Sequence, residues 1–163
     1  MKLAVISTLF ATALFGQTIT PVTPTFSNLP NYWAAVGGGY TQGGYSEGII
    51  SFGANIAGSY YSKTTFDVFK TYTSVRTGFC KAMAQSGNWT LLACVDAGIS
   101  TGTPVIGNFT GGATAAYNLG NKYKSLAGTF VAVEFRVTGA TTSTTVAPNQ
   151  VTPGVFLAVG KSF

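Results

Sequence analysis

The chain of 163 residues has no histidine, two cysteines and few charged side chains. Nine Lys or Arg and four Asp or Glu make up 8% of the residues, against about 25% in an average soluble domain. Without histidine there is no Ser-His-Asp or Cys-His nucleophile system and no histidine-based metal site. Two cysteines alone supply neither a zinc site nor a CxxC redox motif. We therefore expect no cofactor, no metal and no enzymatic activity.

A second shortage is of clustered positive charge. The net charge of +5 comes from scattered lysines, with no basic run of the kind that follows phosphates, so nucleic acid is excluded as the expected partner. Hydrophobic residues reach 46% and the mean hydropathy is +0.32. A soluble domain with so little charge is poorly hydrated, whereas a chain whose outer surface faces lipid has no such difficulty. The composition favours a membrane protein.

Long apolar runs are confined to the start of the chain. The opening "MKLAVISTLFATALFGQ" has the layout of a secretory signal peptide, which we assign to residues 1–16. A buried N-terminal helix or strand is the alternative. The proline-containing residues 17–30 are predicted to be a leader, and residues 31–163 the folded domain. Since no later run approaches the ~18 residues of a membrane helix, a membrane-spanning mature chain has to be a β-barrel.

Alternation of apolar and polar residues continues through most of this domain and is typical of half-buried strands. We predict strands over residues 31–42, 47–58, 61–71, 74–85, 89–100, 111–123, 127–138 and 154–163. Their lengths suit tilted membrane strands of ~9–11 residues. The predicted fold is therefore all-β, an eight-stranded antiparallel up-and-down transmembrane β-barrel. Residues 101–110 and 139–153 are polar or rich in Gly, Pro and Thr, and are predicted to be long outer loops that offer a surface for a ligand.

The last ten residues, "GVFLAVGKSF", alternate apolar side chains and end on an aromatic one. This resembles the C-terminal assembly signal of bacterial outer-membrane β-barrels. With the signal peptide and eight strands, the chain resembles the small family that includes the OmpA transmembrane domain and OmpX. The resemblance implies a location in the bacterial outer membrane, contact with its lipid, and recognition of Val159, Gly160 and Phe163 by the barrel-assembly machinery. Lys161 departs from the family pattern, which has an aromatic or apolar residue there.

Four charged residues fall on the polar faces of their strands, which face the lumen of a barrel: Arg76, Asp96, Glu134 and Arg136. Since burying an isolated charge is costly, we expect them to pair with one another. A gate or ion path is one interpretation. The other is a structural plug, because eight strands enclose room for little more than side chains. A hydrolase that uses Asp96 and Glu134 is disfavoured, because both have arginines available.

The two cysteines flank a tight turn at Ser86-Gly87-Asn88. If Gly87 is the centre of a hairpin, Cys80 lies opposite Cys94, with Phe79 opposite Val95 and Met83 opposite Leu91. Directly opposed residues are close enough for a disulfide. We therefore predict a cross-strand disulfide inside the barrel, with two free buried thiols as the alternative.

Aromatic residues gather near the predicted strand ends, as in the interfacial girdles of membrane barrels. They are Tyr32, Trp33, Tyr40, Tyr60, Tyr61, Tyr72, Trp89, Tyr117, Tyr123 and Phe163. The expected function is non-enzymatic: a structural, adhesive or surface-recognition role through the outer loops. A secreted soluble β-barrel or β-sandwich that binds a small apolar ligand or a partner is the alternative. It requires the opposite polarity, with an apolar core and the charges facing water.

Overall fold

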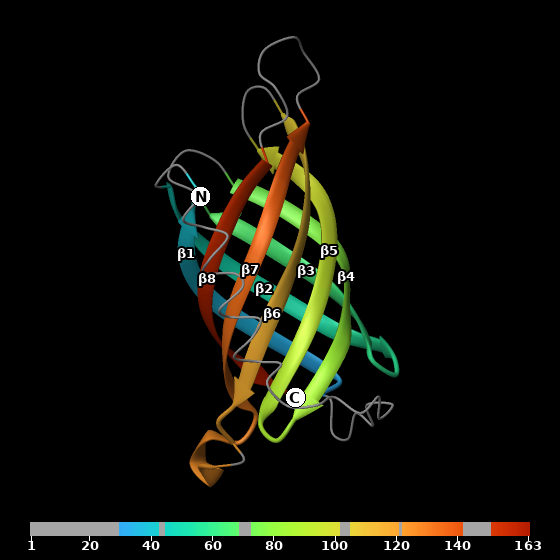
Figure 1. The fold of residues 1–163 in the computed structure, drawn as a ribbon, viewed down its shortest axis with the longest axis vertical. Helices are drawn as coiled ribbons and strands as arrows, with labels where there is room; N and C mark the ends of the chain where they lie inside the picture. Colours follow the sequence, from blue (N-terminus) through green and yellow to red (C-terminus); the bar gives the residue numbers. More distant parts are fainter. Residues whose placement is uncertain (1–29, 43–44, 69–72, 102–104, 121, 142–150) are drawn as a thin grey trace, which may run out of the picture.

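The chain folds into one closed sheet of eight strands (Figure 1). The computed structural model describes residues 30–42, 45–68, 73–101, 105–120, 122–141 and 151–163. The strands are β1 (Tyr32–Thr41), β2 (Tyr45–Ala57), β3 (Tyr60–Val68), β4 (Thr73–Ser86), β5 (Trp89–Thr101), β6 (Ile106–Asn118), β7 (Thr129–Thr141) and β8 (Val151–Ser162). Each pairs antiparallel with its neighbour in the chain, and the predicted eight-stranded up-and-down barrel is confirmed.

The barrel closes where β1 meets β8, from the pair Trp33 and Ser162 to the pair Thr41 and Gly154. The last residue extends this seam: the Phe163 amide donates to the Tyr32 carbonyl over 2.9 Å. Closure satisfies the backbone groups that a strand edge would otherwise expose. Every described strand therefore has a partner on both sides.

The two ends of the barrel differ. At one end, called the turn end below, two-residue turns join β2 to β3 and β4 to β5, and the C-terminus lies there too (Figure 1). Gly87 begins the second turn with a φ of 56°, a left-handed conformation that favours glycine. The β6–β7 connection at this end contains a single 3₁₀ turn, Lys124–Leu126. The opposite end, where β7 finishes and β8 starts, is called the loop end.

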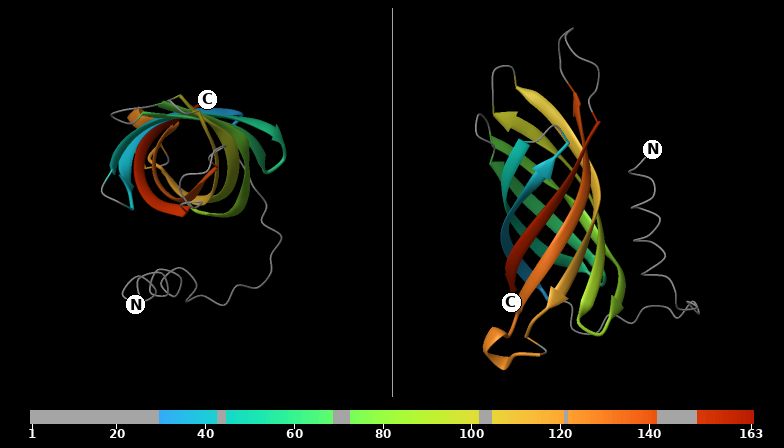
Figure 2. Two further views of the ribbon diagram at one scale, coloured as in Figure 1. Left: turned by 90° about the horizontal axis from the view of Figure 1, so that it is seen from above. Right: turned by 60° about the vertical axis from the view of Figure 1, so that its left-hand side comes forward.

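Alternation along the strands separates two surfaces of opposite character. The outward face carries large apolar side chains that are well exposed, such as Phe79 at 60% and Val95 at 63%. The inward face carries most of the buried polar and charged residues. Viewed along its length, the sheet surrounds a central lumen (Figure 2). The molecule thus has large apolar side chains outside and its acidic side chains inside, the reverse of a water-soluble domain.

The start of β6 corrects one predicted loop. The strand begins at Ile106 rather than at residue 111, so the second half of the predicted loop 101–110 is strand. The Asn108 side chain points inward and donates to the hydroxyls of Ser74 and Ser100 over 2.9 and 3.0 Å, while Phe109 faces outward. Gly and Pro nearby concealed this alternation. The other predicted loop, 139–153, is shortened at both ends by β7 and β8.

Several predictions concern residues outside those that the structure describes. The signal peptide, residues 1–16, lies outside them, as does almost all of the leader, residues 17–30. So do the central parts of the two predicted outer loops, residues 102–104 and 142–150. Within the described residues, no helix is long and apolar enough to cross a membrane.

Candidate functional site in the barrel lumen

Arg76 on β4 is the centre of a buried ionic network. Its side chain is 2% exposed and bonds Asp67 through two nitrogens, Nε to Oδ2 at 2.6 Å and Nη2 to Oδ1 at 2.7 Å. The Nη1 group donates to Asp96 Oδ1 at 3.1 Å and to the Thr110 hydroxyl. The interaction with Asp67 is bidentate, as the planar guanidinium group favours. One cation from β4 therefore holds two carboxylates, from β3 and β5.

Arg136 on β7 extends the network across the lumen. Its Nη1 group donates to Asp67 Oδ1 at 3.0 Å, and its Nη2 group bonds Glu47 of β2. The guanidinium carbon also lies 3.8 Å from the centre of the Phe156 ring on β8, a cation–π contact. Asp67 thus receives hydrogen bonds from two arginines. Strands far apart in the sequence are joined through the barrel interior.

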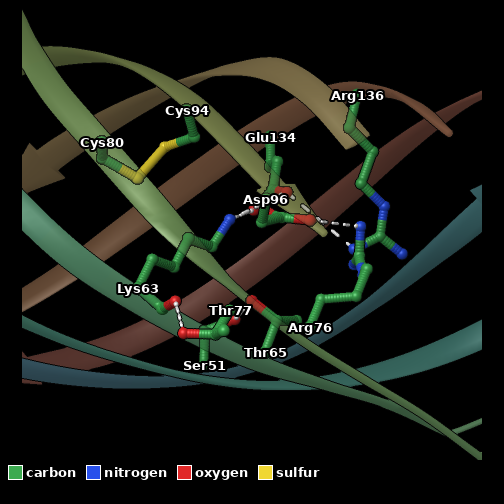
Figure 3. Close-up of a disulfide and its surroundings, with 10 residues drawn as sticks. All are labelled: Ser51, Lys63, Thr65, Arg76, Thr77, Cys80, Cys94, Asp96, Glu134 and Arg136. Carbon is green, nitrogen blue, oxygen red and sulfur yellow. Dashed lines mark hydrogen bonds and ion pairs between the residues drawn. A yellow bond between two sulfur atoms is a disulfide. The ribbon is translucent and has the colours of Figure 1, made fainter. Parts of the chain in front are cut away.

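Lys63 on β3 and Glu134 on β7 form the end of the network that lies nearest the disulfide (Figure 3). The Lys63 ammonium is 3.1 Å from both carboxylate oxygens of Glu134. Arg136 Nη1 lies 3.9 Å from Glu134 Oε1. We call the whole network the lumen charge cluster; its members are Glu47, Lys63, Asp67, Arg76, Asp96, Glu134 and Arg136. It contains all four acidic residues of the chain and one more carboxylate than cations.

The structure brings together all four predicted lumen residues, Arg76, Asp96, Glu134 and Arg136. Sequence reasoning missed Glu47, Lys63 and Asp67. The sequence around Asp67 does not decide its face, because Phe66 and Val68 share one face of an alternating strand and Phe69 falls on the other. In the structure Phe66 and Val68 face outward, so alternation turns Asp67 inward with Lys63. Strict alternation from Ser51 also predicts an inward Glu47.

The chemistry of this cluster is that of mutual neutralisation. Each carboxylate has a cationic partner, and each of the three cations has at least one carboxylate partner. Removing one partner from such a set leaves an uncompensated buried charge. Within the described part of the chain, no group of three or more His, Cys, Asp or Glu side chains is arranged to hold a metal ion. The ion pairs link β2, β3, β4, β5 and β7 across the lumen, and their side chains occupy the space between these strands.

A disulfide joins Cys80 of β4 to Cys94 of β5, as predicted. The two residues are direct partners in the ladder, with their Cα atoms 4.0 Å apart, and both are buried. Phe79 lies opposite Val95 on the outward face, also as predicted. The predicted pair of Met83 and Leu91 is wrong. A bulge at Met83 shifts the register by one, so Ala84 lies opposite Leu91.

The turn-end half of the lumen is hollow. A cavity of about 480 Å³ extends from the lumen charge cluster, where Lys63 and Glu134 line it, to the Gly87-Asn88 turn. Many of its walls are small side chains: Ala35, Ser51, Thr90, Thr114, Ala116, Ala132 and Ala158. Eight-stranded barrels usually have interiors that side chains fill. Here the sequence places small residues at inward positions, and space remains.

Aromatic rings line the same cavity. Trp33 packs edge-on against Phe130, with ring centres 6.3 Å apart, and Tyr61 lies beside the disulfide. A side chain at Gly53 would overlap the Trp33 ring, and one at Gly160 the Phe130 ring, so the two glycines make room for them. Gly160 therefore has a packing role in this structure, beyond the assembly role that the resemblance implied.

Two aromatic residues expected in the outer girdle are inside instead. Trp33 and Tyr61 line the cavity, and Tyr61 is 2% exposed. Each belongs to an adjacent aromatic pair, with Tyr32 and Tyr60 respectively. A period of two forces one member of such a pair inward. Among the other expected girdle residues, the outward, exposed ones are Tyr32, Tyr40, Tyr60, Trp89, Tyr123 and Phe163.

Comparison with family models found no match, and no curated protein matched the chain. Among solved structures, the chain is similar to one described as "De novo design of transmembrane beta-barrels". The two share 13% sequence identity with a TM-score of 0.58, and the match covers 85% of this chain and 100% of the designed one. At this identity the likeness shows the fold alone. The fold is that of a transmembrane β-barrel.

Proposed function

We propose that this protein is a non-enzymatic barrel of the bacterial outer membrane, similar in build to the OmpA transmembrane domain and OmpX. Its barrel serves as a rigid membrane anchor, and its loop end takes part in a structural, adhesive or surface-recognition role. The observation that carries the proposal is the inside-out polarity. All four acidic residues are buried in the lumen, while large apolar side chains cover the outside. A surface of this kind is stable in lipid and unfavourable in water.

The distribution of aromatic and cationic side chains supports the same proposal. Lys81 lies 5.3 Å from the centre of the Tyr60 ring, and Lys122 lies 5.5 Å from that of Tyr123. All four residues are exposed and lie toward the turn end. Tyrosine and lysine in this combination are typical of the headgroup region, where the ring and the alkyl stem stay apolar and the ammonium stays wet. We assign the turn end to the periplasmic interface.

The absence of an enzymatic role is also part of the proposal. Each of the four carboxylates is held in an ion pair inside the lumen. A general base or nucleophile has to be free to take a proton or attack a substrate, and paired, buried carboxylates are poor candidates. A soluble protein would have to shield the exposed apolar side chains on the outward face from water, and no segment among the described residues covers them.

A charge on the outward face tests membrane insertion. Val95 lies at the middle of β5, and Val95→Arg should cost about 2–4 kcal/mol if this position faces the bilayer midplane. The matched control is Ser86→Arg, beside the turn, which should cost about 0–1 kcal/mol at the interface. Urea unfolding in phosphatidylcholine vesicles measures both. Equal, small effects would show that Val95 faces water.

Heat-modifiability gives a second readout. Extracted from outer-membrane fractions in detergent, the native protein should migrate differently on a gel before and after boiling. No shift, or recovery of the protein in the soluble fraction, would overturn the proposed location.

Recognition by the barrel-assembly machinery can be separated from stability through Phe163. Its side chain is 71% exposed, and only its backbone joins the seam with Tyr32. Phe163→Ala should therefore reduce the amount assembled in cells while leaving refolding into vesicles nearly unchanged. Equal loss in cells and in vesicles would assign Phe163 to stability rather than to recognition. The matched control is Val151→Ala, an exposed change at the other end of β8.

A further inference from the structure

We propose that the turn-end cavity is a binding site for a small, largely apolar cation, such as a hydrophobic quaternary ammonium compound. This inference concerns the interior of the barrel and does not depend on the role of the loops. It gives a role to the hollow at the turn end. It also accounts for the aromatic side chains in the walls of the hollow, the carboxylate at its inner end and the polar side chains at its outer end.

The size of the hollow suits a small molecule. Its volume of about 480 Å³ lies within the ~300–1,000 Å³ typical of small-molecule sites. The walls are predominantly apolar: the rings of Trp33, Tyr61 and Phe130, the Leu92 side chain and the disulfide. Such walls bind an apolar body. The hydroxyls of Ser51, Thr90 and Thr114 add polar positions among them.

Three aromatic rings around one space also favour positive charge. The face of an aromatic ring is electronegative, and sets of such rings bind quaternary ammonium groups. The rings come from β1, β3 and β7 and lie next to one another: Trp33 contacts Phe130 edge-on and packs against the cluster that contains Tyr61. A quaternary ammonium ion gives up little hydration free energy among these rings, because its charge is already surrounded by its own apolar groups, which make most of the contacts with the rings.

The inner end of the hollow adds an acidic group. Lys63 and Glu134 both line it, yet the Glu134 side chain is 11% exposed and the Lys63 side chain 3%. The carboxylate is therefore the more accessible of the two charges. The lumen charge cluster, which this pair belongs to, contains one more carboxylate than cations. A cationic ligand restores the charge balance, whereas an anion worsens it.

The outer end of the hollow is polar. Gln85, Asn88, Asn118 and Ser162 line it near the turns. The Gln85 Oε1 atom is buried without a hydrogen-bond partner among the described residues. An acceptor oxygen in this place also favours a cation over an anion. The site thus has a carboxylate at its inner end, amide and hydroxyl groups at its outer end and aromatic walls between them.

The test uses three probes of nearly the same shape. Benzyltrimethylammonium is the cation, neopentylbenzene its neutral carbon isostere, and phenylmethanesulfonate an anion. The chain has two tryptophans, so Trp89→Phe, at an exposed outward position, leaves Trp33 in the cavity wall as the only fluorescent reporter of its type. The full-length Trp89→Phe protein is refolded into phosphatidylcholine vesicles and titrated with each probe, with protein-free vesicles subtracted.

We expect saturable binding of the cation and no binding of the sulfonate. Glu134→Gln should weaken binding of the cation about tenfold, since it removes the accessible carboxylate, and change that of neopentylbenzene less than about twofold. Lys63→Gln should act in the opposite direction and tighten cation binding, because it frees Glu134 from its competing partner. Filling the hollow with Ala116→Leu/Ala132→Leu should weaken binding of both probes.

Two kinds of result would overturn the proposal, one concerning the charge and one the location. If the sulfonate binds as tightly as the cation, or Glu134→Gln affects the cation and its isostere equally, the assigned charge is wrong. If no probe saturates, or the leucine pair leaves binding unchanged, the cavity is not the site. Heat-modifiability of each variant shows that it has folded. Should Glu134→Gln fail to fold, the opposite shift expected for Lys63→Gln still decides the charge.

Discussion

The two halves of the lumen solve the same packing problem in different ways. Toward the loop end, Arg76, Arg136 and Phe156 fill the interior, each 1–2% exposed. Toward the turn end, alanines and other small residues leave a hollow of about 480 Å³. Both halves are enclosed by the same eight strands with the same alternation. The backbone therefore does not determine whether a barrel of this size is filled; the side-chain volumes at the inward positions do.

This difference also separates the sources of stability. In the filled half, long charged side chains from β2, β3, β4, β5 and β7 are tied together by ion pairs. In the hollow half, a disulfide and the Trp33–Phe130 contact join the walls. The filled half is accordingly sensitive to the loss of one partner. The hollow half should tolerate added volume.

The largest expected effect is in the filled half. Arg76→Met removes the bidentate partner of Asp67 and the ion-pair partner of Asp96. Because two carboxylates then lose a buried counter-charge, the barrel should be destabilised by about 3–5 kcal/mol. Urea unfolding in vesicles measures the free energy.

The control for this change removes the charges together. Asp67→Leu/Arg76→Met/Asp96→Leu should recover most of the loss, because all three buried charges are then gone, and Arg136, which loses Asp67, keeps Glu47 as its partner. A triple variant that is less stable than Arg76→Met would show that the network contributes more than charge neutralisation.

The next effect concerns the disulfide at the border of the hollow. Cys80→Ser/Cys94→Ser opens a link that spans 14 residues and should lower stability by about 3 kcal/mol or less. The same unfolding experiment, with and without reductant, measures it. Reductant should shift the wild type toward the variant and leave the variant itself unchanged. Equal shifts in both would point to an effect unrelated to this bond.

The smallest effect should come from filling the hollow. Ala116→Leu/Ala132→Leu adds apolar volume where space exists and should change stability by less than about 1.5 kcal/mol. The matched change in the filled half is Gly154→Leu, where an added Cβ already lies 2.7 Å from the Phe156 ring; it should destabilise the barrel more. A large loss in the leucine pair would mean that the two halves are equally full.

Period-two alternation was enough to predict the fold, the pairing of Cys80 with Cys94 and the inward direction of Arg76 and Asp96. It was insufficient where the pattern was mixed. Asp67 stood among apolar residues that suggested two faces, and the bulge at Met83 shifted a register that looked regular. The direction of the Asp67 side chain and the register beyond Met83 both depend on how neighbouring strands pair.

The hollow and the exact ion pairs were beyond the sequence for a different reason. The space beside Ala132 depends on the summed volumes of inward side chains from several strands. The partners of Arg136 lie on β2, β3 and β7 as well as on the ring of β8, and the register of the closed sheet brings them together. The pattern of residues within one strand predicts neither the cavity nor the ion-pair partners. A three-dimensional arrangement is needed for both.

The position of the disulfide also constrains the order of events during assembly. Cys80 is 1% exposed and lies inside a closed sheet, where a protein oxidant cannot reach its sulfur. Oxidation by such a catalyst therefore has to come before the seam between β1 and β8 closes. The β4–β5 hairpin, with its partners already aligned, is the segment that presents both thiols at that time. A disulfide made by such a catalyst therefore requires β4 and β5 to be paired while β1 and β8 are still apart.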